Sequence, residues 1–372
     1  MKVTRLRAVP VSVPLREPFT SALGTQATSD YGIVLAETDD GALGLGEISL
    51  VWHGKGAALC DVVNTVLAPA VVGSDPFELT RFEAVAERVL TFGRHSLTAV
   101  AGVEMALLDL AGQAAGQPVY NLLGGLARDR VPLSMSLPIA PVPEVLARAR
   151  ELTARGFRTL KVKGAGDHDL LVAAVAALRE EHGPALGLRV DLNMACRLAK
   201  DAIRLVRRLE PYDVLSVEQP LPPADLDGMA LLRAAANVPI MADESVWSVG
   251  DAWNALRAGA ADLVSVYVAE AGGVRAARRV ADLCAAAGVG VAVGSMPELA
   301  IGTAAAAHLA FSVPRLDHPS DVAGTLYHAD DVVTADLTVE DGFLLPPTGP
   351  GLGVRLDPDR LAAYTIKSPG RK

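Results

Sequence analysis

The sequence predicts an α/β protein in which an N-terminal α+β unit precedes a barrel of alternating strands and helices. From about residue 131 onward, short β-branched runs alternate with helical patterns. In the same region, Lys163, Asp191, Glu218 and Asp243 follow successive strand runs at steps of 28, 27 and 25 residues. Each step holds one strand and one helix, and about eight such units make a (β/α) barrel.

The first third of the chain has the pattern of a β-meander followed by helices. We expect strands at 2–15, 31–38 and 43–49. The turn signal Asp39-Asp40-Gly41 joins the second strand to the third. Glycines 41, 44 and 46 form no dinucleotide fingerprint, because no helix follows them. Helical patterns follow at 55–70, 76–91 and 97–115.

The barrel region contains about eight strand-plus-helix units, and the last of them is short. Strands are expected at 131–137, 158–163, 187–192, 213–218, 238–243, 262–268, 289–293 and 315–317. Helices are expected at 143–155, 168–182, 200–209, 226–236, 250–258, 273–287 and 299–311. No Ser/Gly linker interrupts the chain, so we expect packed domains at 1–125, 126–320 and 321–372. The third is expected to return to the first.

Composition excludes several classes of protein. The 372 residues are 51% hydrophobic, which excludes a disordered chain, and the net charge of −9 argues against nucleic acid or an anionic membrane as partner. No uninterrupted apolar run approaches about 18 residues, so no membrane span is expected. The three cysteines lack metal-binding spacing. Such sparse cysteines suit a reducing compartment, and we expect a cytoplasmic protein.

Three carboxylates close consecutive predicted strands: Asp191, Glu218 and Asp243. Charges at the carboxyl ends of barrel strands are typical of catalytic sites. Three oxygen ligands from separate strands suit a hard divalent cation, Mg²⁺ above all, whose charge would relieve their mutual repulsion. The alternative is that these residues form salt bridges or cap loops. Three carboxylates in register after a Lys-x-Lys motif favour the metal site.

Two lysines precede this set on one strand. Lys161 and Lys163 are two residues apart, so their side chains share a face. A neighbouring ammonium and burial both lower the pKa of a lysine, which predicts Lys163 as a general base and Lys161 as a charged support for a substrate carboxylate. Two solvated lysines are the alternative. Asn193 and Glu244 are expected to orient the ligands or their neighbours.

Together these motifs resemble the enolase superfamily, in its muconate lactonizing enzyme subgroup (the mandelate racemase/muconate lactonizing enzyme family). The resemblance runs nearly end to end. It rests on Gln117–Gly125, Lys161-Val162-Lys163, Asp191-Leu192-Asn193, Glu218-Gln219-Pro220, Asp243-Glu244-Ser245, Gly272-Gly273 and Gly349–Gly353.

The resemblance implies a modified (β/α)7β TIM-type barrel with an N-terminal α+β capping domain that the C-terminal segment completes. It also implies one Mg²⁺ per subunit on the three carboxylates, for which Mn²⁺ could substitute. The implied reaction is removal of the proton α to a carboxylate through an ene-diolate, with a small carboxylate as substrate. We further expect a homo-oligomer, from a dimer to an octamer.

One position departs from the subgroup. Its second lysine lies on the sixth strand, five residues before the Gly-Gly pair, and here Tyr267 occupies that place. No histidine follows the seventh strand, where the mandelate-racemase subgroup has one. Tyr267 could act as a general acid, as a hydrogen-bond donor to substrate, as a base with a shifted pKa, or as a space-filling residue.

Further residues are expected near the substrate. The capping segments contribute Thr20, Trp52 and His53, and the ends of the last strands contribute Ser295, Glu298 and Asp317. Packing roles are the alternative for each of them.

The missing lysine favours reactions that need one base. We expect β-elimination, as in a dehydratase acting on a hydroxy acid or a hydroxy-amino acid such as a hydroxyproline. Cycloisomerisation of the muconate type is the next alternative, followed by racemisation or epimerisation of amino-acid derivatives. A non-catalytic barrel protein is the alternative from a different class.

Overall fold

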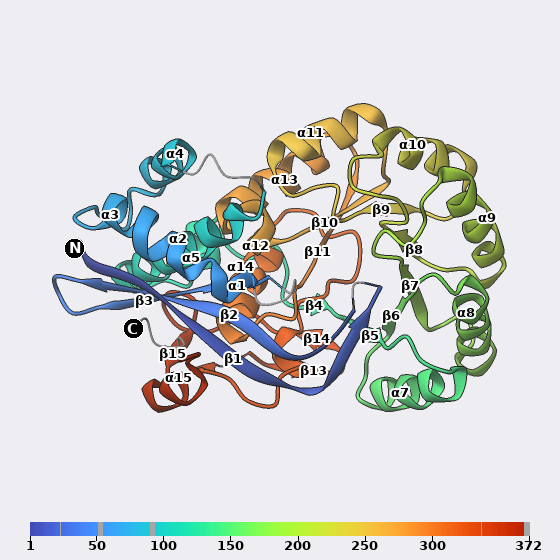
Figure 1. Ribbon diagram of the computed structural model, residues 1–372, viewed down its shortest axis with the longest axis horizontal. Coiled ribbons are helices and arrows are strands. Elements are labelled where there is room, and N and C mark those ends of the chain that lie inside the picture. The colour runs from blue at the N-terminus through green and yellow to red at the C-terminus, as the bar shows by residue number, and fades with distance from the viewer. Residues whose placement is uncertain (23, 51–54, 90–93, 336, 368–372) are drawn as a thin grey trace.

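The computed structural model describes residues 1–22, 24–50, 55–89, 94–335 and 337–367, and it has the α/β architecture that the sequence predicts. A three-stranded antiparallel sheet with helix α5 forms an N-terminal capping domain, and a curled seven-stranded parallel sheet forms the barrel. Figure 1 shows helices α7 to α11 around the outside of that sheet.

The cap sheet is longer than expected. Its strands are β1 (Val3–Ser21), β2 (Gly24–Thr38) and β3 (Leu43–Ile48). The pairing of β1 with β2 runs from Val3 opposite Thr38 to Ser21 opposite Gly24, with a register shift between Pro14 and Phe19. The polar residues between 16 and 30 therefore form a hairpin, because cross-strand pairing extends past the apolar alternation that marks a strand in sequence.

Helix α5 (Ser96–Ala115) packs directly on this sheet. A Cβ on Gly46 would lie 1.8 Å from the Gly102 carbonyl oxygen, so only glycine allows this approach. Contrary to the sequence-based expectation, α5 is long and apolar enough to cross a membrane, with a mean hydropathy of 1.2. Its apolar stretch is 83% buried inside the protein, which is the property of a core helix.

The remaining cap helices are shorter than the sequence pattern predicts. The expected helix at 55–70 is divided into α1 (Lys55–Ala58), α2 (Cys60–Val62), a π-helical turn η1 (Val63–Leu67) and α3 (Ala68–Val71). Pro69 lies in the first turn of α3, and its missing N–H accounts for a break before it. Helix α4 (Leu79–Val89) follows.

The barrel strands lie in chain order, each parallel to the next. They are β5 (Ser134–Leu137), β6 (Thr159–Lys163), β7 (Gly187–Asp191), β8 (Ser216–Glu218), β9 (Ile240–Ala242), β10 (Leu263–Val266) and β11 (Gly290–Val293). The connecting helices are α7 (Val142–Ala154), α8 (His168–His182), α9 (Ala199–Leu209), α10 (Leu226–Ala235), α11 (Val249–Ala258), α12 (Val268–Ala271), α13 (Val274–Ala286) and α14 (Ala300–Ser312). Three further short helices are α6 (Val119–Leu122), η2 (Glu210–Tyr212) and η3 (Gly324–Leu326).

The eighth strand expected at 315–317 is absent from the described residues, and an irregular segment closes the barrel instead. The Asp317 and Asp321 amides donate to the Val291 and Val293 carbonyls of β11, at 2.9 Å each. On the other side, the Ser134 amide of β5 donates to the Ser320 carbonyl at 2.8 Å. Prolines 314 and 319 interrupt this segment, so ladder bonds form without a regular strand.

The C-terminal segment returns to the cap. Its elements are β12 (Val333–Ala335), β13 (Val339–Glu340), β14 (Phe343–Leu344), β15 (Val354–Leu356) and α15 (Pro358–Tyr364); β14 pairs with β4 (Val131–Pro132). The Ile366 amide donates to the Pro10 carbonyl of β1 at 2.8 Å. Asp109 of α5 accepts from the amides of Leu45 and Leu352, at 3.0 and 2.8 Å. We propose the domain boundaries after residues 125 and 320 on these contacts.

Buried carboxylates of the cap hold the barrel helices. Glu47 of β3 accepts from the Leu299 and Gly302 amides at the start of α14, at 2.9 and 2.8 Å. Glu104 of α5 accepts from the first two amides of α13, at 2.9 and 3.0 Å. Helix N-termini present unpaired N–H groups and a partial positive charge, so both contacts anchor the cap to the barrel.

We predict that Glu47→Gln lowers the free energy of unfolding by about 1–3 kcal/mol. The amide group of glutamine would face a backbone N–H that loses its acceptor. Denaturant titration followed by circular dichroism measures the change. Glu87→Gln on the exposed surface of α4 is the control, expected to shift stability by less than about 0.5 kcal/mol. Equal midpoints for the two variants would contradict the anchoring role.

Candidate functional site

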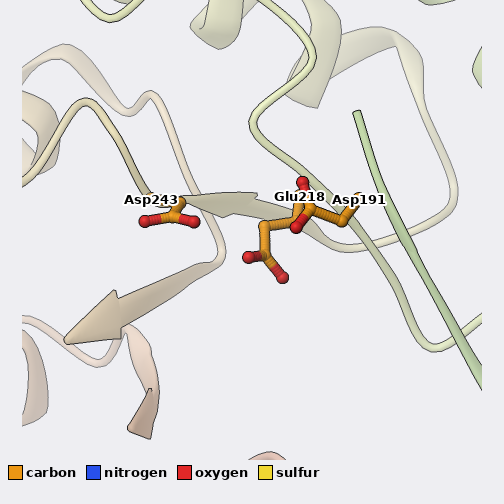
Figure 2. Close-up of side chains that lie close together, drawn as sticks. All are labelled: Asp191, Glu218 and Asp243. Atoms are coloured by element: carbon orange, nitrogen blue, oxygen red, sulfur yellow. The ribbon is translucent and has the colours of Figure 1, made fainter. Parts of the chain in front are cut away.

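Three carboxylates meet at the carboxyl ends of β7, β8 and β9. The strand register places Asp191 beside Lys163 on one side and beside Glu218 on the other, and Asp243 follows β9 directly. One ligand atom from each carboxylate lies within 4.8 Å of the others, and all three residues are buried. Figure 2 shows the three side chains extending into one shared space from separate strand ends.

The electrostatics of this cluster favour a bound cation. Burial raises the pKa of Asp243 well above its ordinary value, and the charges of Glu244 and Glu218 add to the shift. For Glu218, burial also raises the pKa, but Lys161 and Arg189 outweigh it and lower the pKa to about 2. A divalent cation among the three oxygens would stabilise the ionised form of Asp243. The donor set, all carboxylate oxygen, fits Mg²⁺.

Lys161 lies in the middle of a buried ion-pair network. Its Nζ is 2.9 Å from Glu218 Oε1, 2.5 Å from Asp321 Oδ2 and 3.7 Å from Asp191 Oδ2. Burial lowers the pKa of Lys161, but Asp321 and Glu218 outweigh burial and raise it. The ammonium therefore keeps its charge, which fits the support of a substrate carboxylate and not the role of a base.

Lys163 lies at the edge of the same network. Its Nζ is 2.6 Å from Asp191 Oδ2 and donates to Asn193 Oδ1 at 3.1 Å. Burial and Lys161 lower the pKa of Lys163, as the sequence suggested, but Asp191 outweighs them and raises it. The expected lowering is therefore wrong for this arrangement of charges. A divalent cation bound by Asp191 would oppose that attraction and favour the neutral amine.

Two amide side chains fix the carboxylates in place. The backbone N–H of Asn193 donates to Asp191 Oδ1 at 3.0 Å, and its side-chain Nδ2 donates to Glu244 Oε1 at 3.0 Å. Gln219, for which the sequence predicted no role, accepts from the backbone N–H groups of Asp243 and Ser245 at 2.9 and 3.2 Å. These bonds link the loops after β7, β8 and β9, so the ligand set is held by its own connecting segments.

Two charged residues of the network, Arg189 and Asp321, were not predicted from the sequence. Arg189 is fully buried, and it contacts Glu218 Oε2 at 2.7 Å and Asp321 Oδ1 at 2.8 Å. Its position two residues before Asp191 on the same strand was a usable signal, because both side chains point to one face. Asp321 lies in the irregular closing segment, where no periodicity marks it. Burial raises the pKa of Asp321, but Arg189 and Lys161 outweigh burial and lower it.

Tyr267 lies at the end of β10, next to the carboxylates. Its hydroxyl donates to Asp243 Oδ2 at 3.1 Å, and its ring packs in a small apolar cluster with Leu50, Trp247 and Met296. Burial raises the pKa of Tyr267 well above 10, and Asp243 adds to the shift. The hydroxyl is therefore a protonated hydrogen-bond donor at neutral pH, which argues against the role of a base.

The cap reaches the site through its hairpin tip. The Phe19 ring centroid is 5.7 Å from Lys163 Nζ, and Thr20 hydroxyl lies 2.9 Å from that of Thr25. Phe19 and Thr20 line a pocket of about 550 Å³ with residues at the end of β5. Trp52 and His53 lie outside the described residues.

The candidates after β11 divide into two groups. Glu298 is buried and accepts from the Met296 amide at 2.9 Å, while the Ser295 hydroxyl also donates to it. This contact shapes the loop after β11. Asp317 does not join the site: it pairs with Arg315 at 2.6 Å and accepts from the Val291 amide near the start of β11. It therefore lies at the amino end of that strand, and Asp321 takes the place beside the lysines.

We predict that Asp321→Asn lowers the free energy of unfolding by about 3–5 kcal/mol at neutral pH, because it leaves Arg189 and Lys161 short of a buried partner. The lowered pKa means that this contribution is present above the unfolded pKa of about 3.9 and is lost as the pH falls through the folded pKa. Denaturant titration at several pH values measures both effects.

The control for this variant is Asp169→Asn, which breaks an exposed pair with Arg208 and is expected to cost at most about 1 kcal/mol. An Asp321→Asn protein as stable as the wild type at neutral pH would contradict the network.

Known proteins resemble this chain over both the cap and the barrel. Residues 3–124 match the N-terminal domain of mandelate racemase/muconate lactonizing enzymes, and residues 144–360 match the enolase C-terminal domain-like family. The L-Ala-D/L-Glu epimerase of Bacillus subtilis is 34% identical, with 95% of this chain and 97% of that protein covered. Muconate cycloisomerase 1 of Rhodococcus opacus is 31% identical, with 98% and 99% covered.

A crystal structure of a dipeptide epimerase from Enterococcus faecalis, in complex with Mg and the dipeptide L-Leu-L-Tyr, superposes with a TM-score of 0.87. The two sequences are 30% identical, and the alignment covers 95% of this chain and 99% of that one. The matches span both domains, the cap and the barrel. The chain therefore belongs to the mandelate racemase/muconate lactonizing enzyme family of the enolase superfamily.

Proposed function

We propose that this protein is a Mg²⁺-dependent cycloisomerase of a small dicarboxylate, in which Lys163 is the single base that exchanges the proton α to a carboxylate. The observation that carries the proposal is Tyr267, a protonated phenol where the family has its second lysine. Relatives named cycloisomerase and epimerase both support an isomerase. A cytoplasmic location and a homo-oligomeric assembly stay predictions.

The three carboxylates would hold the metal, and the bound cation would supply positive charge for the carboxylate of the substrate as it becomes an ene-diolate. Lys161, held charged by Asp321 and Glu218, offers a second positive group to the same carboxylate. Lys163 adds or removes the α-proton, and Asn193 holds its amine at 3.1 Å. These side chains alone supply orientation, charge and one proton-transfer group.

Racemisation and epimerisation need a proton acceptor on each face of the intermediate. The ring of Tyr267 packs against Leu50, Trp247 and Met296. Its hydroxyl donates its hydrogen bond to Asp243. Tyr267 therefore does not take over the role of the second lysine as a base. Cycloisomerisation needs only one proton-transfer group, because the ring closes or opens by a bond between carbon and the second carboxylate oxygen.

β-Elimination is the second candidate, and it also needs one base. The observation in its favour is the protonated Tyr267 hydroxyl, which would donate to a leaving group only by giving up its bond to Asp243. The names of the relatives favour isomerisation over the dehydratase reaction expected from the sequence. The lysine pair and the buried carboxylates oppose a non-catalytic barrel, which would need neither.

We predict that the protein exchanges the α-hydrogen of its substrate with solvent in D₂O, that metal removal abolishes the exchange, and that Lys163→Ala slows it by about 10²–10⁴-fold. NMR measures the rate of this exchange for a panel of unsaturated dicarboxylates, lactones, hydroxy acids and N-acyl amino acids. Lys200→Ala on the exposed face of α9 is the control and should keep wild-type rates. Full exchange by Lys163→Ala would overturn the assignment.

A second prediction concerns stereochemistry. With one base, deuterium enters one face only, and the substrate recovered from D₂O keeps its configuration. Chiral chromatography of recovered substrate and product measures this. Equal rates of interconversion of two enantiomers would show a second base and would favour a racemase or epimerase.

A further inference from the structure

The hydrogen bond between Tyr267 and Asp243 joins the ends of two neighbouring strands. Tyr267 follows β10 and Asp243 follows β9, and these strands pair in parallel. The hydroxyl donates to Asp243 Oδ2 at 3.1 Å with both residues buried, at 6% and 4% exposure. This side-chain hydrogen bond therefore links the carboxyl ends of the two strands, beyond their last backbone pair.

The end of β11 makes room for this tyrosine. A Cβ on Gly294 would lie 2.2 Å from Tyr267 Cε2 and 2.4 Å from its Cζ, which are ring atoms and cannot bend away. It would also lie 2.7 Å from Ser265 Oγ, whose hydroxyl can rotate. Gly294 does not have a positive φ, so its backbone conformation does not require glycine. The space taken by the ring does.

We infer that Tyr267 is a positioning residue that fixes the Asp243 carboxylate for the metal, and that the missing side chain of Gly294 leaves room for the ring. The inference rests on the proposed metal site. Asp243 has no cationic side chain as an ion-pair partner in the described residues, whereas Glu218 has Lys161 and Arg189. The phenol hydroxyl therefore supplies the side-chain hydrogen bond that fixes its orientation.

A space-filling tyrosine is the competing explanation, and the hydroxyl separates the two. Phenylalanine would keep the contacts with Leu50, Trp247 and Met296 but would lose the bond to Asp243. Groups that orient metal ligands by hydrogen bonds change metal affinity by about 10–100-fold when removed. A residue that only fills space changes packing and leaves metal affinity unaltered.

The test is calorimetric titration of the full chain with Mg²⁺. We expect Tyr267→Phe to bind about 10-fold or more weakly than wild type. Tyr364→Phe is a matched control, because it also removes a tyrosine hydroxyl that donates to an aspartate, Asp330, at 2.7 Å. It should bind Mg²⁺ as wild type does. Equal affinity of Tyr267→Phe and wild type would overturn the role of Tyr267 alone.

Gly294→Ala tests the second half of the inference. The added methyl group should displace the ring and weaken Mg²⁺ binding in the wild-type background, but it should have little further effect in Tyr267→Ala, where the ring is gone. Additive effects would overturn the pairing of Gly294 with Tyr267. A wild-type protein that binds no Mg²⁺ would overturn the metal site itself, and this inference with it.

Discussion

The burial of charge at the carboxyl ends of β6 to β9 is the constraint on which the rest of the site depends. Five carboxylates lie there, those of Asp191, Glu218, Asp243, Glu244 and Asp321, together with the three cations of Lys161, Lys163 and Arg189. Lys163 and Asp321 are partly buried and the others are buried. Charges without water must be paired or neutralised. The network pairs those at the Arg189 end and leaves those around Asp243 in excess. A divalent cation bound by the three carboxylates would complete the balance at the point where a substrate carboxylate would bind.

This arrangement assigns different tasks to similar side chains. Lys161 is surrounded by acids and stays charged, whereas Lys163 contacts one carboxylate that a cation would share. The difference comes from Asp321, which the irregular closing segment brings next to Lys161. Asp321 makes this contact from an irregular segment and not from a regular eighth strand. Residues 317–321 therefore both close the barrel and keep Lys161 charged, which distinguishes it from Lys163.

Much of this fold could be predicted from spacing. The strand-plus-helix steps located the seven barrel strands and the three carboxylates, since parallel strands must end at one edge. Three features escaped prediction for physical reasons. The hairpin of β1 and β2 depends on pairing across the chain, the closing segment 317–321 has no periodicity, and the pKa of Lys163 depends on which acid contacts it. The sequence pointed to Asp317 and not to Asp321, because it does not reveal which residue of a short irregular segment reaches the carboxyl end.

The central claim is that one divalent cation binds among the three carboxylates. The most direct measurement is anomalous diffraction from crystals grown with Mn²⁺, which occupies oxygen sites of this kind. The account predicts one peak per chain, within coordinating distance of Asp191, Glu218 and Asp243. The ion pair between Lys161 and Asp321 should remain. No peak at that position, or a peak elsewhere in the barrel with these carboxylates unligated, would contradict it.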